Sequence, residues 1–202
     1  MTPTKYSMSF TTGALFRHES IKMATLYASH KQWEDVRNTV ISENIIQART
    51  TNTLKRVTNE IISRMKTLTE QELTFIVEAS YTEQGYMLWL AICRRYAFIA
   101  DFALDVVHNN FMSLKNVVQP EDYNVFFNKK AEWHGEIDDI AASTKRKLRQ
   151  TLFQMMREAN LLDKNNVLIP IVPSAQFKTI LAAVPEREAM FFPISDLARR
   201  AG

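Results

Sequence analysis

The stretch TTNTLKRVTNEIISRMKTL, residues 50–68, decides the fold class. Cap-forming side chains stand at its start, from Thr50 to Asn52. Its apolar residues then recur at helical spacing and form one stripe: Leu54, Val57, Ile61, Met65 and Leu68. The stretch therefore predicts an amphipathic helix whose apolar side faces a protein core.

The rest of the chain also favours helices. Its 202 residues, 46% of them hydrophobic and 23% charged, suffice for one sizeable core or two small ones. Four glycines and six prolines are too few to supply the turns of a β-sandwich. We therefore expect an all-α globular fold in one unit. Its expected parts are an N-terminal lobe at 1–68, a central scaffold at 69–135 and a C-terminal lobe at 136–202.

Capping side chains mark several expected helix starts. A first helix is expected to run to about Ser29, and a second helix to begin near Gln32. The last strong helix carries Leu148 and Leu152 on its apolar side. The expected caps are Thr11 or Thr12, Thr69 with Glu72 as a capping box, Thr82, and Ser143 or Thr144.

Two apolar runs joined by a polar turn follow that last helix. Leu161–Leu162 and Val167–Ile169 flank a turn at residues 163–166. The pattern fits a small β-hairpin and, nearly as well, a helix end followed by a loop. Pro170 and Pro173 then end the pairing, because proline has no backbone N–H to donate.

The segment Tyr86–Val107 has the length of a membrane span but the wrong charges. Each of its four charged residues would cost about 2.5 to 3.5 kcal/mol in the middle of a bilayer. The segment is therefore expected to form buried core helices of a soluble protein. The N-terminus lacks the pattern of a signal peptide, and the single Cys93 cannot form an internal disulfide. A cytoplasmic location without membrane contact is expected.

Sequence motifs give no support for catalysis. The chain has no glycine-rich phosphate loop, nucleophile elbow, His-Glu-x-x-His helix or Cys-x-x-Cys pair. Its four histidines are dispersed and lack ligand partners at metal spacing. We therefore expect no enzyme activity, metal, cofactor or small-molecule substrate.

Charge is unevenly distributed along the chain. Residues 1–68 carry ten Lys or Arg against five acids, residues 69–142 five against twelve, and residues 143–202 ten against five. The three segments are thus +5, −7 and +5. The two basic ends suggest two surfaces that bind a polyanion, and the acidic middle suggests a scaffold that faces protein partners. Alternatively, the charges cluster by chance on solvated faces.

The side of the 50–68 helix opposite its apolar stripe has the composition of a recognition helix. Lysine and serine suit phosphates, Arg56 can pair with guanine, and Asn59 can pair bidentately with adenine. The preceding helix and the turn through Ile45–Ile46 would complete a helix-turn-helix. A merely solvated face would also expose such residues. The candidate DNA-binding residues here are Asn52, Lys55, Arg56, Asn59, Ser63 and Lys66.

A second basic face lies on the helix expected after Ser143. A short helix, a basic helix and a hairpin follow each other in the order of a winged helix-turn-helix, with Lys164 on the wing. Phe153 is expected near the DNA side, or packed under the hairpin or against a partner. The candidate DNA-binding residues are Lys145, Arg146, Lys147, Arg149, Gln150, Arg157 and Lys164.

The sequence resembles the BrxA family of the bacteriophage exclusion (BREX) defence systems. The stretches that carry the resemblance are FTTGALFRHES (10–20), SENIIQARTTNTLKRVTNEIISRMKTL (42–68), LWLAICRRYAFIADFA (88–103), KAEWH (130–134) and TKRKLRQTLFQMMREANLLD (144–163). Asn160 stands where the family is expected to have glycine. Asparagine is the next best residue for a left-handed helix end.

The resemblance implies a helical fold with helix-turn-helix elements and a role in a system that methylates host DNA and blocks phage replication. It also implies other BREX proteins as partners, including a methyltransferase and large ATPases. Three functions follow as alternatives: a non-catalytic double-stranded-DNA-binding module, a NusB-like RNA-binding protein, and a protein-protein adaptor. The two basic helices favour double-stranded DNA, because the deep groove of A-form RNA is too narrow for a helix.

Overall fold

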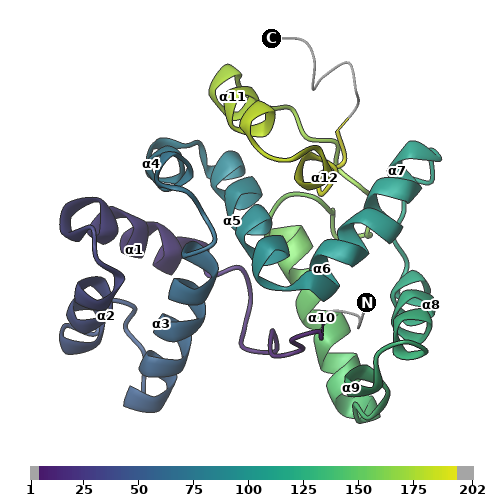
Figure 1. Ribbon diagram of the computed structural model, residues 1–202, viewed down its shortest axis with the longest axis horizontal. Coiled ribbons are helices and arrows are strands. Elements are labelled where there is room, and N and C mark those ends of the chain that lie inside the picture. Colours follow the sequence, from purple (N-terminus) through teal and green to yellow (C-terminus); the bar gives the residue numbers. More distant parts are fainter. Residues whose placement is uncertain (1–4, 195–202) are drawn as a thin grey trace.

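The computed structural model describes residues 5–194, and this part of the chain is all-α, as predicted (Figure 1). Helices α1 to α3 gather on one side and α8 to α10 on the other, with α5 and α6 between them. In chain order the elements are α1 (Arg17–His30), α2 (Trp33–Ser42), α3 (Thr51–Met65), α4 (Glu70–Glu78), α5 (Tyr81–Arg95), α6 (Ala97–Phe102), the π-helical segment η1 (Ala103–His108), α7 (Asn109–Met112), α8 (Pro120–Ala131), α9 (Gly135–Asp138), α10 (Ala142–Glu158), α11 (Ala175–Ala183) and α12 (Glu186–Ala189).

Helix α3 forms as its sequence predicts. The Thr50 side chain accepts a hydrogen bond from the backbone N–H of Thr53 at 3.2 Å and caps the helix. The predicted apolar stripe is buried, and it packs α3 against α2, α1 and α5. The opposite side, with the candidate DNA-binding residues, is left at the surface.

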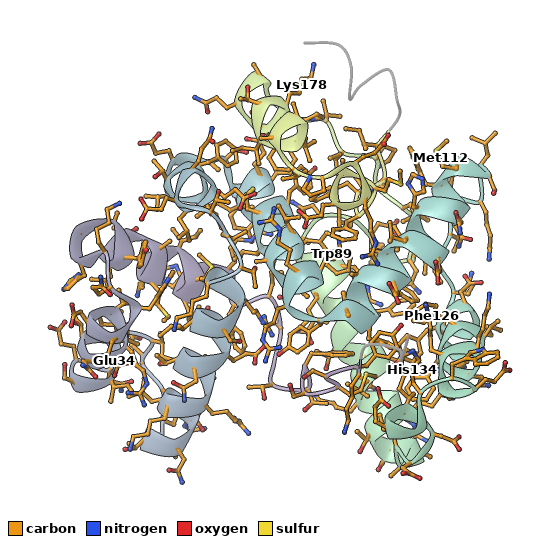
Figure 2. All side chains as sticks on the ribbon, viewed as in Figure 1. Glu34, Trp89, Met112, Phe126, His134 and Lys178 are labelled. Atoms are coloured by element: carbon orange, nitrogen blue, oxygen red, sulfur yellow. The ribbon has the colours of Figure 1, made fainter. Side chains whose placement is uncertain are left out.

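One apolar core joins the helices on the two sides of the molecule. It draws buried residues from all three ranges predicted as lobes. Trp89 of α5 lies at its centre, fully buried, and its indole N–H donates to the carbonyl oxygen of Phe191 at 3.0 Å (Figure 2). Phe191 and Phe192 are themselves buried, so this segment docks on the core.

The predicted caps have mixed outcomes. Thr69 and Glu72 form the predicted capping box at the start of α4. Helix α5 is capped by Ser80, two residues before the predicted Thr82, because the Ser80 hydroxyl accepts the backbone N–H of Glu83. Helix α10 begins at Ala142 without a side-chain cap, so the prediction of a Ser143 or Thr144 cap is wrong.

The prediction that Thr11 or Thr12 caps the first helix is also wrong, because α1 begins only at Arg17. The backbone before it is bound by distant side chains. Arg64 donates to the carbonyl oxygen of Ala14 at 2.9 Å, and the Leu15 N–H donates to the Glu158 carboxylate at 2.7 Å. These bonds replace helical ones and hold residues 11–16 as an irregular segment between the two sides of the molecule.

The apolar run Tyr86–Val107 forms core helices, as predicted. It is interrupted at Tyr96, whose extended backbone separates α5 from α6. The helical path then passes through η1 and continues to Met112, beyond the end of the apolar run. Among residues 5–194 no helix has the length and apolar character needed to cross a membrane.

The chain reverses after α10 where a hairpin was predicted, but the pairing is minimal. Asn160 ends the helix in the left-handed conformation at φ 57°, as expected of a residue in the place of glycine. Antiparallel bridges then join Leu162 to Leu168 and Val117 to Val167. Within the described residues these are isolated bridges and not strands.

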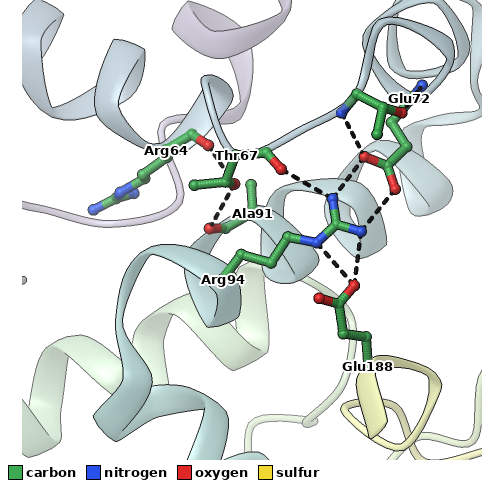
Figure 3. A network of polar contacts seen from close by, with 7 residues as sticks. Arg64, Thr67, Glu72, Ala91, Arg94 and Glu188 are labelled. Atoms are coloured by element: carbon green, nitrogen blue, oxygen red, sulfur yellow. Dashed lines mark hydrogen bonds and ion pairs between the residues drawn. The ribbon is translucent and has the colours of Figure 1, made fainter. Parts of the chain in front are cut away.

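A buried ion network holds α4, α5 and α12 together (Figure 3). The Arg94 guanidinium donates to both carboxylate oxygens of Glu72, at 2.6 and 2.9 Å, and to the Glu188 carboxylate at 2.7 Å. It also donates to the carbonyl oxygen of Thr67 at 3.0 Å. Arg94 is therefore a structural residue of the core and not a surface charge.

Gly85 sets the distance between α5 and the end of α10. A Cβ added there would lie 3.1 Å from Cα and 3.2 Å from the carbonyl oxygen of Ala159, both backbone atoms that cannot turn away. We expect Gly85→Ala to destabilise the protein by about 1–2 kcal/mol, since overpacking outweighs the gain in helix propensity. Calorimetric unfolding would measure the loss.

Gly135→Ala is the matched control for this prediction. A Cβ on Gly135 of α9 meets nothing within 4 Å. Alanine there is expected to keep or raise the free energy of unfolding, because it favours helical backbone. If both variants unfold at the same temperature, the close approach at Gly85 does not limit the packing.

Candidate nucleic-acid interface

Helix α10 presents a basic side to solvent because its apolar side is fixed in the core. Leu148, Leu152 and Met155 are fully buried, which leaves the opposite side outward. We name this side the α10 basic face; its residues are Lys145, Arg146, Lys147, Arg149, Gln150 and Arg157. Lys145 and Arg149 are half-buried, and the other four are exposed.

Neutral asparagines position the partnered cations of the α10 basic face. Lys145 donates to the Asn128 side-chain oxygen at 2.5 Å, and Arg149 to that of Asn124 at 3.2 Å. The third pair joins Arg157 to the side-chain oxygen of Asn166, at 2.9 Å. Because an amide carries no charge, these bonds orient the cations and leave their positive charge uncompensated.

Other cations of the protein meet carboxylates instead. Arg64 pairs with Glu60, Arg94 with Glu72, Lys115 with Asp122, and Lys130 with Asp101. Each of these pairs cancels charge within the protein. The α10 basic face therefore differs from those sites in the charge that it offers to an external anion.

The pKa values of two lysines show the same contrast. Burial lowers the pKa of Lys145, and the positive charge of Arg149 lowers it further. Burial would also lower the pKa of Lys130, but hydrogen bonds and charge from Asp101 and Asp105 outweigh it and raise the pKa. Lys145 thus lies in a positive environment and Lys130 in a negative one.

A cleft of about 480 Å³ runs along the α10 basic face. Lys147, Arg149 and Arg157 line it, together with Pro120 at the start of α8 and Asn166 in the turn after α10. Its described lining contains no carboxylate. The cleft therefore fits a small anionic group.

Phe153 lies beneath this surface and not on it. Its ring is buried and packs toward the ring of Phe102, with centroids 6.5 Å apart. The Arg157 guanidinium lies over the outer side of the ring at 5.9 Å. Phe153 is therefore buried in the core and is not exposed on the proposed DNA side. Lys164 is exposed in the turn that follows.

The α3 basic face comprises the residues predicted on that helix, and the structure leaves all but Ser63 exposed. They are Asn52, Lys55, Arg56, Asn59, Ser63 and Lys66. Ser63 donates to the Glu60 carbonyl oxygen at 2.8 Å and accepts from Arg95 at 3.3 Å, so it is bound within the protein. The Asn59 side-chain oxygen accepts from Arg37 of α2 at 3.0 Å.

Sequence reasoning missed four residues that complete these two faces. They are Arg37, Asn124, Asn128 and Asn166. The asparagine partners lie 9 to 25 positions from their cations, on α8 or in the turn after α10. A local pattern search cannot link positions so far apart. The proline at the start of α8 was the available signal that this helix exists.

The described residues offer neither a group of metal ligands nor an accessible thiol. Between residues 5 and 194, no three His, Cys, Asp or Glu side chains are grouped so that they could hold a metal ion. Cys93 is fully buried, and burial raises the pKa of its thiol well above the usual range.

Solved structures contain the same fold. A crystal structure described as that of an uncharacterized protein from Magnetospirillum magneticum superposes with a TM-score of 0.79. The match covers 94% of this chain and 98% of that one at 16% sequence identity. At this identity the likeness concerns the fold alone.

Sequence comparisons identify relatives over most of the chain. The BREX protein BrxA of Escherichia coli O9:H4 (strain HS) is 26% identical over 168 residues, which cover 81% of this chain and 79% of that protein. The BREX protein BrxA of Bacillus cereus (strain H3081.97) is 23% identical over 128 residues, or 63% of this chain and 64% of that protein. The family model described as BrxA matches residues 4–184. The chain therefore belongs to the BrxA family.

Proposed function

We propose that the protein is a non-catalytic, double-stranded-DNA-binding component of a BREX anti-phage defence system. The observation that carries the proposal is the uncompensated charge of the α10 basic face, whose oriented cations are held by amides. Cations held in this way suit the phosphates of a nucleic-acid backbone. Family membership supports the defence role, because two similar proteins are named as BREX proteins.

The order of the elements around α10 supports a duplex over a single strand. Segment 116–118, helix α8, the short helix α9, the basic helix α10 and the reversal at 161–169 follow each other along the chain. The bridges Val117–Val167 and Leu162–Leu168 join the three non-helical segments. This order resembles that of a winged helix-turn-helix and supports the proposal. In such modules the last helix enters the major groove and the wing reaches the backbone.

The α3 basic face is the second proposed contact with DNA. Lys55, Arg56 and Lys66 are exposed there. Because Asn59 accepts a hydrogen bond from Arg37, bidentate pairing with adenine would first have to release that bond. Phosphate contact is therefore the leading role of α3, and base reading is secondary.

The proposal predicts that duplex DNA binds with modest sequence preference and strong salt dependence. With about six phosphate contacts, affinity should fall by about 1,000-fold between 50 and 200 mM salt. The measurement is fluorescence anisotropy with purified protein and labelled 20-base-pair DNA, beside single-stranded DNA, single-stranded RNA and double-stranded RNA of matched length.

The comparison among probes separates the alternatives. Preference for duplex DNA supports the proposal, whereas preference for either RNA supports the NusB-like alternative. An affinity for duplex DNA that does not change with salt concentration contradicts the proposal. The two basic faces consist mostly of Lys and Arg, and contacts of these residues with phosphate weaken as salt increases.

Exposed apolar residues favour a second role, contact with other BREX proteins. Leu114 and Trp133 are 83% and 75% exposed, and Met112 and Val125 are also largely exposed. They lie in residues 69–142, the segment of net charge −7. Solvent-exposed apolar residues among acids suit a protein partner better than DNA. The methyltransferase and the large ATPases of the system are the proposed partners.

A further inference from the structure

The cleft along α10 differs from a general basic surface because two of its cations are held in fixed positions. Cations from α10 line it, and each of its two arginines is fixed by an asparagine from another element. We propose that this cleft is a seat for a backbone phosphodiester, and that Asn124 and Asn166 are positioning residues that hold Arg149 and Arg157 without neutralising them. The inference deepens the proposed function and rests on it for the identity of the polymer.

The conformation of the turn after α10 places Asn166 beside Arg157. The Asp163 carboxylate accepts the backbone N–H groups of Asn165 at 2.8 Å and Val167 at 2.7 Å, which closes the turn. Asn166 adopts the left-handed conformation at φ 63°, which asparagine tolerates better than most residues. Its amide oxygen thereby meets the Arg157 guanidinium, and within residues 5–194 the remaining N–H donors of that group have no other hydrogen bond.

Arg149 is held by a residue of helix α8. Its guanidinium meets the amide oxygen of Asn124 on α8, and its side chain is half-buried. Lys147 of the same lining is exposed, so the cleft offers a third cation that is free to adjust. Two oriented guanidiniums and a lysine match a phosphodiester, because a guanidinium can donate two N–H groups to one phosphate.

The presence of asparagine rather than aspartate at positions 124 and 166 distinguishes positioning of the arginines from neutralisation of their charge. Aspartate has nearly the same shape and would accept the same hydrogen bonds, but it would cancel the charge that the cleft offers. Asn→Asp therefore separates positioning from charge. A residue that served stability alone would tolerate aspartate, which adds an ion pair to the folded state.

The test is Asn166→Asp against Asn165→Asp, one position earlier in the same turn. Both variants change the net charge equally, but only the first meets Arg157. We expect Asn166→Asp to weaken duplex DNA binding by about 5- to 10-fold and to lower the salt slope by about 1, as for one lost phosphate contact. Asn165→Asp should change affinity by less than about 2-fold, and Asn124→Asp should behave like Asn166→Asp. Both effects should occur without loss of thermal stability.

A second probe separates the seat from the proposed function. Inorganic pyrophosphate should shift the guanidinium NMR signals of Arg149 and Arg157 in the wild type and shift them less in Asn166→Asp. If duplex DNA does not bind but pyrophosphate gives this difference, the proposed function fails and the seat stands. If Asn166→Asp and Asn165→Asp behave alike in DNA affinity, in salt slope and toward pyrophosphate, the seat is refuted.

Discussion

Replacing Arg146 and Lys147 together with glutamate is expected to weaken duplex DNA binding by about 100-fold near 0.1 M salt. Each phosphate contact contributes a salt slope of about 0.9, or roughly 8-fold at 0.1 M relative to 1 M salt. Two lost contacts give about 60-fold, and the new negative charges add repulsion. Anisotropy with a labelled duplex over a range of salt concentrations measures both the affinity and the slope.

Arg146 and Lys147 are the best pair for this test because their removal leaves the rest of α10 in place. Both are exposed, and within residues 5–194 neither has a hydrogen bond or ion pair to lose. Lys145 and Arg149 are poorer choices, since both are half-buried and bound to asparagines of α8. Thermal unfolding of the double variant should match the wild type.

The double variant Lys129→Glu, Lys178→Glu is the control, because it makes the same change in net charge on α8 and α11. Its affinity for DNA should fall by less than about 3-fold at 0.1 M salt, because neither lysine belongs to the α10 or the α3 basic face. Equal losses in the two double variants would mean that net charge, and not the α10 basic face, governs binding.

Local patterns predict the parts of the fold that local physics determines. The α3 stripe and the Thr69–Glu72 capping box form as expected, because helical spacing and capping depend on residues three or four positions apart. The outward sides of α3 and α10 follow from the same spacing, so most of the candidate residues are exposed as predicted.

Tertiary partners decide what the sequence leaves open. Residues 11–16 carry good caps, but Arg64 and Glu158 bind their backbone, and the helix starts later. Asn124 and Asn166 look like ordinary polar residues until folding brings them to Arg149 and Arg157. Arg94 is a third example. Its charge in the sequence argues against a membrane span, but no local pattern identifies the two carboxylates that bind it.

Arg94→Ala is expected to destabilise the fold by about 3–5 kcal/mol, the largest effect of any single substitution proposed. The cost arises from what the change leaves behind. The Glu72 side chain is 5% exposed and that of Glu188 21% exposed, so two carboxylates would lose their cation inside the protein. Chemical denaturation followed by circular dichroism would measure the loss, and α12 should detach first because Glu188 ties it to Arg94 of α5.

Arg95→Ala is the matched control at the next position. Its guanidinium meets the Ser63 hydroxyl at 3.3 Å and the ring of Tyr96 at 5.0 Å, and no carboxylate among the described residues. Its loss should cost about 1 kcal/mol or less, because no buried charge is stranded. A further variant, Arg94→Met with Glu72→Gln and Glu188→Gln, should recover most of the stability, since removing a whole buried ion network costs less than removing one partner. If that triple variant is as unstable as Arg94→Ala, the network stabilises the fold by its own attraction, and stranded charge is not the cause.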